Sequence, residues 1–401
     1  MKVLMFGWEF PPISSGGLGT ACYGLTKALS RKGTDITFVL PYSSDQINAD
    51  FAKFVSSSKI KIKKIKSIIS PYMTSSSYSA ERMKNPKKAI YGKTLFEEVY
   101  RYTISAEQIA DEEEFDVVHC HDWMTFGAGI AASKRKNKPL VVHVHSTEFD
   151  RTGGNGINDY VYNLEKAGMQ KADRIVAVSN YTKNMIVNHY GISQDKIDIV
   201  YNGVEDEFCC PENNFEIKKG CKVVLFLGRI TLQKGPDYFI YAASRVLEKE
   251  KNVRFIVAGT GDMEPFIIEK AAEMGIADKV LFAGFLNKED TMRAYKMADV
   301  YVMPSVSEPF GITALESVKN ETPAIISNQS GVSEVLHHCL KVDFWDVNEL
   351  SNKIISLLRY DALGSCIKEN SSFEVSKINW DAAADKCLAV YDNLGRGAEQ
   401  R

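Results

Sequence analysis

The sequence predicts an α/β protein with two doubly wound parallel sheets. Its 401 residues are enough for two or three domains, each with a sizeable core. Short apolar runs alternate with amphipathic helical stretches, and this series starts twice, at Val3–Phe6 and again at Val223–Leu227. Near-continuous apolar strands are typical of a parallel sheet that helices cover on both faces. Two such series therefore indicate two domains of the same architecture.

The first series fills a predicted N-terminal domain over residues 1–205. A helix is expected over Thr20–Arg31, because Ala21 and Leu25 lie on one helical face. Gly33 stands where a glycine commonly ends a helix. The further strands expected in this domain are Asp35–Leu40, which Pro41 would end, Val117–Cys120, Leu140–Val144 and Arg174–Val178.

The second series fills a predicted C-terminal domain over residues 206–378, after a polar linker. Pro236 opens its first helix at the position that proline favours. Residues 379–401 are expected to carry a last helix over Asp381–Leu394, which crosses back to the N-terminal domain, and a loose tail over 395–401. The further strands expected in this domain are Arg254–Ala258, Val280–Phe282, Val300–Met303 and Ala324–Ile326.

The composition excludes several classes of protein. The formal net charge of -2 argues against nucleic-acid binding driven by overall charge. Hydrophobic residues make up 45% of the chain and charged residues 25%, as in an ordinary folded protein. No apolar run reaches the roughly 18 residues of a membrane-spanning helix, and the N-terminus is typical of a strand and not of a signal peptide. The eight cysteines form no C-x-x-C pair, so we expect a cytoplasmic protein without a disulfide framework.

Residues 51–93 form a basic insertion. This stretch holds eleven basic residues and one acid, Glu81, so the rest of the chain carries a net charge of -12. Lysine and isoleucine alternate over Lys59–Lys63, as in an edge strand that turns its lysines outward. A solvated edge and loop explains this composition, and so does a basic patch for anionic lipid or a large acceptor. The sequence leaves both interpretations open.

A glycine-rich loop, Ser14–Thr20, joins the first strand to the first helix. Gly16, Gly17 and Gly19 let backbone N–H groups approach an anion at the positive end of a helix. A tight turn between strand and helix would use the same glycines, so this loop by itself is weak evidence of a binding site. Its spacing matches neither the dinucleotide fingerprint nor the P-loop.

Two segments of the second domain carry stronger signals. In Gly228–Gly235, Arg229 offers a bidentate donor and Lys234 a compact positive charge, which together suit a diphosphate. The later segment Met303–Glu316 runs from strand through loop to helix, with Glu308 in the loop and Glu316 about two turns into the helix. Free N–H groups at a helix start can hold a phosphate, and glutamates accept hydrogen bonds from sugar hydroxyls.

Together, the three segments resemble those of retaining glycosyltransferases with the GT-B fold, in which two Rossmann-like domains face each other. More narrowly, they are similar to glycosyltransferase family 4 and to the glycogen and starch synthases, and the resemblance covers nearly the whole chain. His119–Trp123 and Val142–Ser146 resemble first-domain motifs of glycogen synthases. The most specific segment is Glu308–Glu316, and the glycine-rich loop adds much less.

The resemblance implies a role for each candidate residue. Arg229 and Lys234 would bind the donor diphosphate and stabilise the charge on the departing nucleotide. Glu308 would lie beside the donor sugar, and Glu316 would hold the ribose hydroxyls. The backbone N–H groups expected at the phosphate or the sugar are those of Gly16, Gly17, Phe310, Gly311 and Ile312.

In the first domain, the resemblance implies that His145 lies near the anomeric centre and that Asp122 lies close by. Retention through a covalent intermediate would need a carboxylate nucleophile at the anomeric carbon, and this family has no agreed one. The usual proposal for the family is front-face attack, in which the leaving phosphate takes the acceptor proton. We therefore assign no nucleophile.

Histidines alternate on two neighbouring predicted strands, at positions 119, 121, 143 and 145. Three interpretations fit these histidines. They are hydrogen-bonded groups at the edge of the core, or the polar wall of a sugar cleft, or, together with Asp122, zinc ligands. No D-x-D triplet occurs in the chain, and nothing in the sequence requires a divalent ion. We therefore expect no metal and no cofactor, with a nucleotide sugar as co-substrate.

The expected function is retaining transfer of a hexose, most simply glucose, from UDP- or ADP-glucose to a growing α-glucan. Bacterial synthases that use ADP-glucose carry a lysine where this chain has Ser14, and they usually lack the glutamate at the position of Glu316. The sequence therefore favours UDP-glucose as the donor at least as strongly as ADP-glucose. A family 4 enzyme for a surface polysaccharide or glycolipid, with membrane contact through residues 51–93, is the main alternative. A UDP-N-acetylglucosamine 2-epimerase and an inactive sugar-binding protein are lesser ones.

Overall fold

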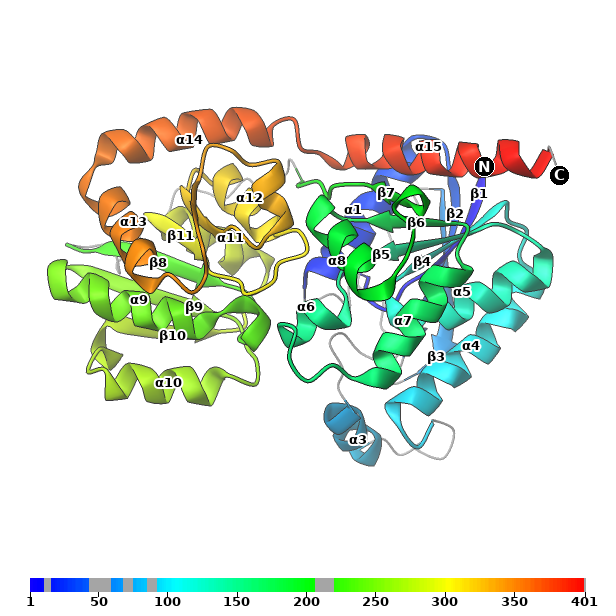
Figure 1. Ribbon diagram of the computed structural model, residues 1–401, viewed down its shortest axis with the longest axis horizontal. Helices are drawn as coiled ribbons and strands as arrows, with labels where there is room; N and C mark the ends of the chain where they lie inside the picture. The colour runs from blue at the N-terminus through cyan, green and yellow to red at the C-terminus, as the bar shows by residue number, and fades with distance from the viewer. Residues whose placement is uncertain (11–15, 43–58, 68–74, 85–91, 206–219, 400–401) are drawn as a thin grey trace. The chain divides into compact units, whose positions relative to one another are not determined.

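The computed structural model describes residues 1–10, 16–42, 59–67, 75–84, 92–205 and 220–399. These residues form two compact units, each with a parallel sheet and surrounding helices (Figure 1). Unit 1 comprises Met1–Glu148, Asn158–Gly203 and Trp380–Arg401, and unit 2 comprises Phe149–Ile157 and Val204–Asn379. The predicted α/β class with two doubly wound parallel sheets is confirmed.

The sheet of unit 1 has the strand order β3-β2-β1-β4-β5-β6-β7. Every strand pairs in parallel with its neighbours, and the central strands are fully buried. Its strands are β1 (Lys2–Phe6), β2 (Asp35–Tyr42), β3 (Ile60–Lys66), β4 (Val117–His121), β5 (Leu140–Val144), β6 (Arg174–Ala177) and β7 (Ile197–Ile199).

Helices cover this sheet in two groups. Contacts join α4 to α5 and α5 to α7 in one group, and α1 to α15 in the other. Right-handed crossovers that run in opposite directions from the centre of a sheet place their helices on opposite faces. The helices are α1 (Gly17–Arg31), α3 (Ser75–Lys84), α4 (Leu95–Glu112), α5 (Trp123–Lys136), α7 (Asp159–Lys171), α8 (Asn180–Tyr190), the 3-10 turn η2 (Gln194–Lys196) and α15 (Trp380–Glu399).

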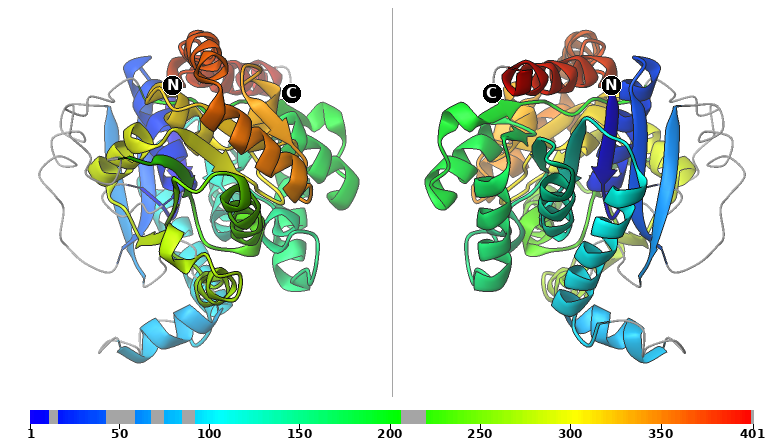
Figure 2. Two further views of the ribbon diagram at one scale, coloured as in Figure 1. Left: turned by 90° about the vertical axis from the view of Figure 1, so that its left-hand side faces the viewer. Right: turned by 90° about the vertical axis from the view of Figure 1, so that its right-hand side faces the viewer.

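The sheet of unit 2 has the strand order β10-β9-β8-β11-β12-β13 and is also parallel. The left view of Figure 2 turns this unit toward the viewer and shows helices around its sheet. The strands are β8 (Lys222–Leu227), β9 (Val253–Ala258), β10 (Val280–Gly284), β11 (Val300–Met303), β12 (Ala324–Ser327) and β13 (Leu340–Val342).

The core of unit 2 lies between this sheet and helices α9 and α13, which pack on each other. The α-helices are α9 (Pro236–Lys249), α10 (Glu264–Glu273), α11 (Lys288–Met297), α12 (Ile312–Lys319), α13 (Val347–Arg359) and α14 (Asp361–Val375). The short helix α6 (Glu148–Thr152) also belongs to this unit, except for its first residue, Glu148. The 3-10 turns are η4 (Leu232–Lys234), η5 (Ala277–Lys279) and η6 (Gly331–Glu334).

Helix α15 follows α14 in the chain but belongs to unit 1, where it packs on α1. A Cβ atom on Gly24 of α1 would lie 2.2 Å from the indole of Trp380, so the close approach of these helices requires glycine there. Arg31 and Asp381 add an exposed ion pair with a separation of 2.8 Å. Figure 1 draws α15 in red beside α1 in blue.

Several predicted boundaries were wrong. Strand β2 continues through Pro41 to Tyr42, since proline keeps a strand-compatible φ and its carbonyl. The tail predicted over residues 395–401 is helical as far as Glu399. Glycines at 395 and 397 each weaken a helix by only about 1 kcal/mol, so they do not end it. The short edge strands β7 and β13 were not predicted, because three-residue runs carry little periodic signal.

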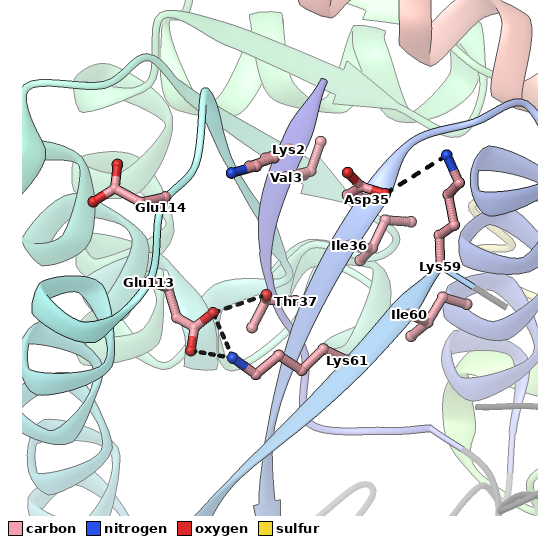
Figure 3. A pocket seen from close by; sticks show the side chains of 10 residues that line it. All are labelled: Lys2, Val3, Asp35, Ile36, Thr37, Lys59, Ile60, Lys61, Glu113 and Glu114. Atoms are coloured by element: carbon pink, nitrogen blue, oxygen red, sulfur yellow. Dashed lines mark hydrogen bonds and ion pairs between the residues drawn. The ribbon is translucent and has the colours of Figure 1, made fainter. Parts of the chain in front are cut away.

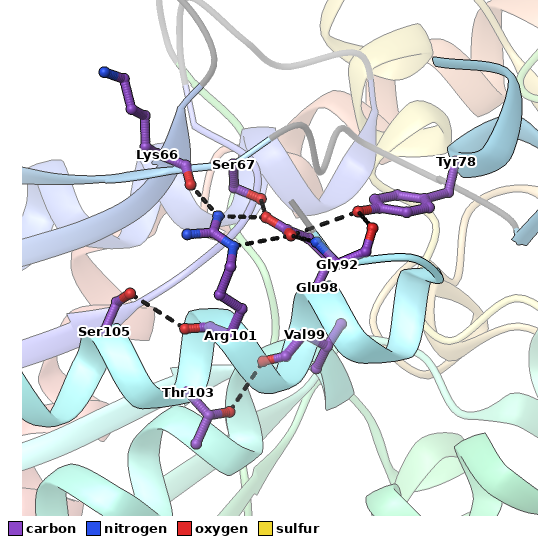
Figure 4. Close-up of polar contacts among 9 residues, drawn as sticks. All are labelled: Lys66, Ser67, Tyr78, Gly92, Glu98, Val99, Arg101, Thr103 and Ser105. Atoms are coloured by element: carbon purple, nitrogen blue, oxygen red, sulfur yellow. Dashed lines mark hydrogen bonds and ion pairs between the residues drawn. The ribbon is translucent and has the colours of Figure 1, made fainter. Parts of the chain in front are cut away.

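A buried carboxylate anchors the described part of the basic insertion to helix α4 (Figure 4). Glu98 accepts hydrogen bonds from Ser67 Oγ at 2.6 Å, from the Gly92 amide at 2.8 Å and from Arg101 Nε at 2.9 Å. The hydroxyl of Tyr78, on α3, reaches the same carboxylate. Burial by itself would raise the pKa of Glu98, but the hydrogen bonds from Arg101, Ser67 and Gly92 outweigh it and lower the pKa.

Among the described helices, none combines the length and the apolar character that crossing a bilayer requires. The predicted polar linker lies almost wholly outside the described residues, as do Ser14 and much of the basic insertion.

Candidate active site

Each sheet reverses its strand order at one point, between β1 and β4 in unit 1 and between β8 and β11 in unit 2. Ligands of doubly wound sheets bind outside the carboxyl ends of the strands at this switch point. In unit 1, the glycine-rich loop follows β1 and Asp122 follows β4. In unit 2, Arg229 follows β8 and Glu308 follows β11. The predicted site residues that follow these four strands therefore lie at the switch points, whereas His145 follows β5.

In unit 2, the centre of the predicted site is an ion pair between Lys234 and Glu308. Lys234 Nζ lies 2.5 Å from Glu308 Oε2, and Ser305 Oγ donates to the same oxygen at 3.2 Å. Glu308 is only 6% exposed. Its amide donates to Gln329 O and its carbonyl accepts from Gly331 N, both at 2.9 Å. The loops that follow β11 and β12 thus hold this carboxylate in place.

The turn that carries Lys234 packs directly on the loop after β11. Gly235 has φ +64°, and a Cβ atom there would lie 2.2 Å from the Pro304 carbonyl oxygen. Gln233 is buried, its carbonyl accepts from Val306 N at 2.9 Å, and its side chain accepts from Arg229 at 2.8 Å. At position 235, only glycine tolerates both the positive φ and the closeness of the Pro304 carbonyl. This glycine therefore allows the turn to bring Lys234 to Glu308.

Sequence reasoning missed three residues that shape this site, namely Gln233, Gly235 and Ser305. The available signal was the Gly-Pro pair at the start of α9, which marks a sharp turn before a helix. Nothing in the sequence distinguished the glutamine or the serine, because polar residues are common in loops.

Helix α12 supplies the second predicted glutamate. Gly311, at φ +107°, precedes the helix, and a Cβ atom there would lie 3.0 Å from Val332 and 3.1 Å from Met303. The helix begins at Ile312, so Glu316 lies about one turn into it and not two, as the sequence suggested. Tyr295 Oη donates to Glu316 at 3.1 Å, and burial raises the pKa of this carboxyl.

In unit 1, Asp122 organises the segment that contains His145. Its Oδ1 accepts from the backbone amides of His145 at 2.7 Å and Ser146 at 3.3 Å. Its own amide donates to His143 O at 3.0 Å, and its φ is +59°, a rare value for a residue other than glycine. Asp122 is 5% exposed. It therefore positions the segment after β5 through backbone hydrogen bonds.

Four of the histidines of unit 1 form one cluster, in which His119, His121 and His143 are buried and His145 is partly buried. His121 Nδ1 lies 2.9 Å from His145 Nε2, and His119 Nε2 lies 3.3 Å from His143 Nδ1. Burial lowers the pKa of His119 and of His145 to about 3 and also lowers the pKa of the other two. These imidazoles are therefore neutral at physiological pH.

The described part of the glycine-rich loop begins at Gly16, which precedes α1 with an extended backbone. The amide of Gly19 donates to the buried carboxylate of Glu9 at 3.1 Å. A Cβ atom on Gly17 would meet no other atom within 4 Å. Packing within the chain therefore does not require glycine at position 17. Glu9 was not predicted as a site residue.

A separate pocket lies at the opposite, amino edge of the unit 1 sheet, beside the starts of β1, β2 and β3 (Figure 3). Lys61 Nζ contacts Glu113 at 2.6 Å there, and Thr37 donates to the same carboxylate at 3.3 Å. Lys63 pairs with Glu112 at 2.7 Å. Acids next to α4 thus offset two charges of the basic insertion, and this pocket is not part of the candidate site.

Comparison with known proteins decides the family. The model for glycosyl transferases group 1 matches residues 212–372, and the model for glycosyltransferase family 4 matches residues 15–208. The chain is a GT-B glycosyltransferase of the family 4 type. An uncharacterised glycosyltransferase of Methanocaldococcus jannaschii is 29% identical over 98% of both chains.

Two further relatives have named activities. A glycogen synthase of Mycobacterium tuberculosis is 25% identical over 84% of this chain and 80% of its own. A D-inositol 3-phosphate glycosyltransferase of Thermobifida fusca is 26% identical over 69% of both chains.

Solved structures show the same fold. Sucrose-phosphate synthase from Thermosynechococcus elongatus matches 99% of both chains with a TM-score of 0.79 and 18% identity. Anabaena HepE, in complex with UDP and glucose, covers 98% of this glycosyltransferase and 100% of its own chain, with a TM-score of 0.73 and 16% identity.

Proposed function

We propose that this glycosyltransferase transfers glucose, with retention of configuration, from UDP- or ADP-glucose to a growing α-glucan. The observation that supports the donor side is the partly buried ion pair of Lys234 and Glu308 at the switch point of unit 2. The glucan acceptor is supported by the similarity to a glycogen synthase and by the motif that contains His121 and Asp122.

The ion pair leaves both partners with capacity for a donor sugar nucleotide. A lysine ammonium has three N–H donors, and Glu308 uses one of them, so two remain for phosphate oxygens. Both hydrogen bonds to Glu308 described above end on Oε2, so Oε1 is the oxygen for a sugar hydroxyl. A fixed cation beside the diphosphate stabilises the negative charge that develops as the glycosidic bond breaks.

Glu316 and Arg229 complete the proposed donor site. Tyr295 holds one Glu316 oxygen, and the carboxylate then accepts from the ribose hydroxyls. Arg229 reaches the same loop as Lys234 through its bond to Gln233 and adds a second cation for the diphosphate. In unit 1, Asp122 fixes the backbone of His145, which we place near the donor sugar.

Family 4 transfer to a surface polysaccharide, a glycolipid or a small polyol phosphate is the second candidate. It is favoured by the basic insertion, with membrane contact through residues 51–93, and by the similarity to the inositol phosphate enzyme. Two of its lysines already pair with acids of the same unit, which weakens the attraction of this face to anionic lipid.

The test measures nucleoside diphosphate release from UDP-glucose, ADP-glucose, UDP-N-acetylglucosamine and GDP-mannose, with and without glycogen. Release from one glucose donor that rises strongly with glycogen supports the glucan synthase. Slow release that ignores glycogen but rises with inositol phosphate or with lipid vesicles moves the acceptor to the second candidate. A change in the stereochemistry of the donor sugar without any acceptor would indicate an epimerase.

A further inference from the structure

Helix α6 brings a buried acid to the loop that carries Glu308. Residues Phe149–Ile157 lie between β5 and α7 in the chain, but they belong to unit 2. Asp150 is in α6 and is 0% exposed. Ser307 Oγ donates to Asp150 Oδ1 at 2.6 Å, and Ser307 is 4% exposed. A side chain from the first half of the chain thus reaches the residue next to Glu308.

The hydrogen bond between Ser307 and Asp150 is short and buried. Its length is typical of a hydroxyl that donates to a carboxylate, for which the range is about 2.5–2.7 Å. Such a bond is roughly twice as strong as one between two neutral groups. Burying a carboxylate is costly, and a neutral acceptor at position 150 would have a smaller cost. The acid therefore indicates a firm anchor for Ser307.

The rest of the segment packs beside the same loops. A Cβ atom on Gly153 would lie 2.9 Å from Leu232, which is in the same turn as Lys234, and 3.4 Å from Val306. Gly153 has φ +61°, and its amide donates to Asp150 O at 3.4 Å, so the helix ends in a tight turn at this contact. The backbone that carries Asp150 is therefore held in place, and its carboxylate can fix the serine.

Three contacts hold the loop after β11 around Glu308. Val306 N donates to Gln233 O and Glu308 N donates to Gln329 O, both at 2.9 Å. These two bonds hold the backbone on either side of residue 307, from the loops after β8 and β12. The bond from Ser307 to α6 adds a third contact between them. Loss of this third contact would let the backbone turn at residue 307 and would move the Glu308 carboxylate.

We propose that Asp150 is a positioning residue for glycosyl transfer, which holds Ser307 and thereby the loop that presents Glu308 to the donor sugar. This inference rests on the proposed donor site. A displacement of about 1 Å can cost up to about 100-fold in rate, so a contact that fixes this loop affects turnover strongly. The diphosphate is assigned to Arg229 and Lys234, in the loop after β8, so its affinity should change little.

The first test is Asp150→Ala in the full chain, with the glucose donor that the enzyme prefers. We expect kcat to fall by about tenfold or more, while calorimetry shows less than about a twofold change in nucleoside diphosphate affinity. Asp150→Asn keeps an acceptor for the serine hydroxyl and should lose less turnover. Asp159→Ala makes the matched change at an exposed position at the start of α7 and should leave both quantities unchanged.

Two results would overturn the positioning role. One is an Asp150→Ala enzyme with turnover within twofold of the wild type. The other is a loss of nucleoside diphosphate affinity as large as the loss of kcat, because general damage to unit 2 would produce it.

A double-mutant cycle tests whether Asp150 acts through Ser307. Ser307→Ala should lower kcat about as much as Asp150→Ala, and the double variant should lose no more than either single variant, because both changes remove the same bond. Losses that multiply would show that the two residues act independently and would contradict the proposal. Urea unfolding checks the fold of each variant, and Ser307→Ala still tests the contact if Asp150→Ala does not fold.

The same assay separates this inference from the proposed donor site. If Glu308→Gln loses turnover and Asp150→Ala does not, the donor site stands and the positioning role fails. If Glu308→Gln keeps normal turnover, both fail, because Glu308 then has no part in transfer.

Discussion

The two switch points differ in what holds their polar side chains. In unit 2, a salt bridge between Lys234 and Glu308 connects the loops after β8 and β11. In unit 1, neutral imidazoles and hydrogen bonds from backbone amides to Asp122 join the end of β4 to the loop after β5. The same strand order thus supports a charged site in one unit and a mostly neutral one in the other. Removing a charge should therefore be far more harmful in unit 2.

The largest effect is expected from the ion pair. Lys234→Ala removes a cation that we place at the leaving diphosphate, and kcat should fall by about 100-fold or more. Glu308→Gln keeps the shape of the side chain but removes the counter-charge, and we expect a similar loss. Steady-state kinetics with the preferred glucose donor measure both, and circular dichroism checks that the variants fold. A Glu308→Gln enzyme with nearly normal turnover would remove this charge from the mechanism.

The backbone contact that supports the ion pair is tested at Gly235. An alanine there meets the Pro304 carbonyl at 2.2 Å, so we expect a loss of more than about 2 kcal/mol in unfolding free energy and a loss of donor binding. Gly275→Ala is the matched control, since it has a similar φ of +67° but no atom within 4 Å. The control should lose only about 1 kcal/mol, from backbone strain. Urea unfolding curves compare them, and equal losses would mean that the contact is unimportant.

Asp122 tests the neutral character of the unit 1 site. Asp122→Asn keeps an oxygen acceptor for the amides of residues 145 and 146, and asparagine tolerates a positive φ. We expect turnover within about tenfold of the wild type, since backbone contacts are retained. Asp122→Ala leaves two amides without this acceptor and should lower the free energy of unfolding by about 1–3 kcal/mol. If the asparagine variant is as inactive as Glu308→Gln, unit 1 depends on charge as well.

The smallest effect is expected at the buried carboxylate of the basic insertion. Glu98→Gln weakens charge-assisted hydrogen bonds and should lower the free energy of unfolding by about 1–2 kcal/mol. The control is Glu107→Gln, an exposed position on the same helix, which should leave the free energy of unfolding almost unchanged. Because the pKa of Glu98 is lowered in the fold, its stabilisation is present above the ordinary value of 4.5 and is lost as pH falls below it. Urea unfolding at neutral and acidic pH should show the two proteins converging in acid.

The elements of the fold followed closely from local sequence. Strands such as Leu140–Val144 and Val300–Met303 were predicted with their observed bounds, because continuous apolar runs next to turn residues have few other solutions. The first turn of α1 and the last turn of α15 were missed, since helix ends depend on capping and packing more than on periodicity. The residue types of the candidate site were also chosen from sequence, and their catalytic roles stay predictions.

By itself, the sequence determined the strand and helix series, and motif likeness indicated the glycosyltransferase family that the comparisons confirmed. Those features depend on residues that are close in the chain. Only the tertiary structure decided which distant groups meet, such as Lys234 with Glu308, or Asp150 with Ser307. It also showed that two buried histidine nitrogens have no partner among the described residues. Such facts depend on the burial and spacing of side chains from different strands, which no local pattern encodes.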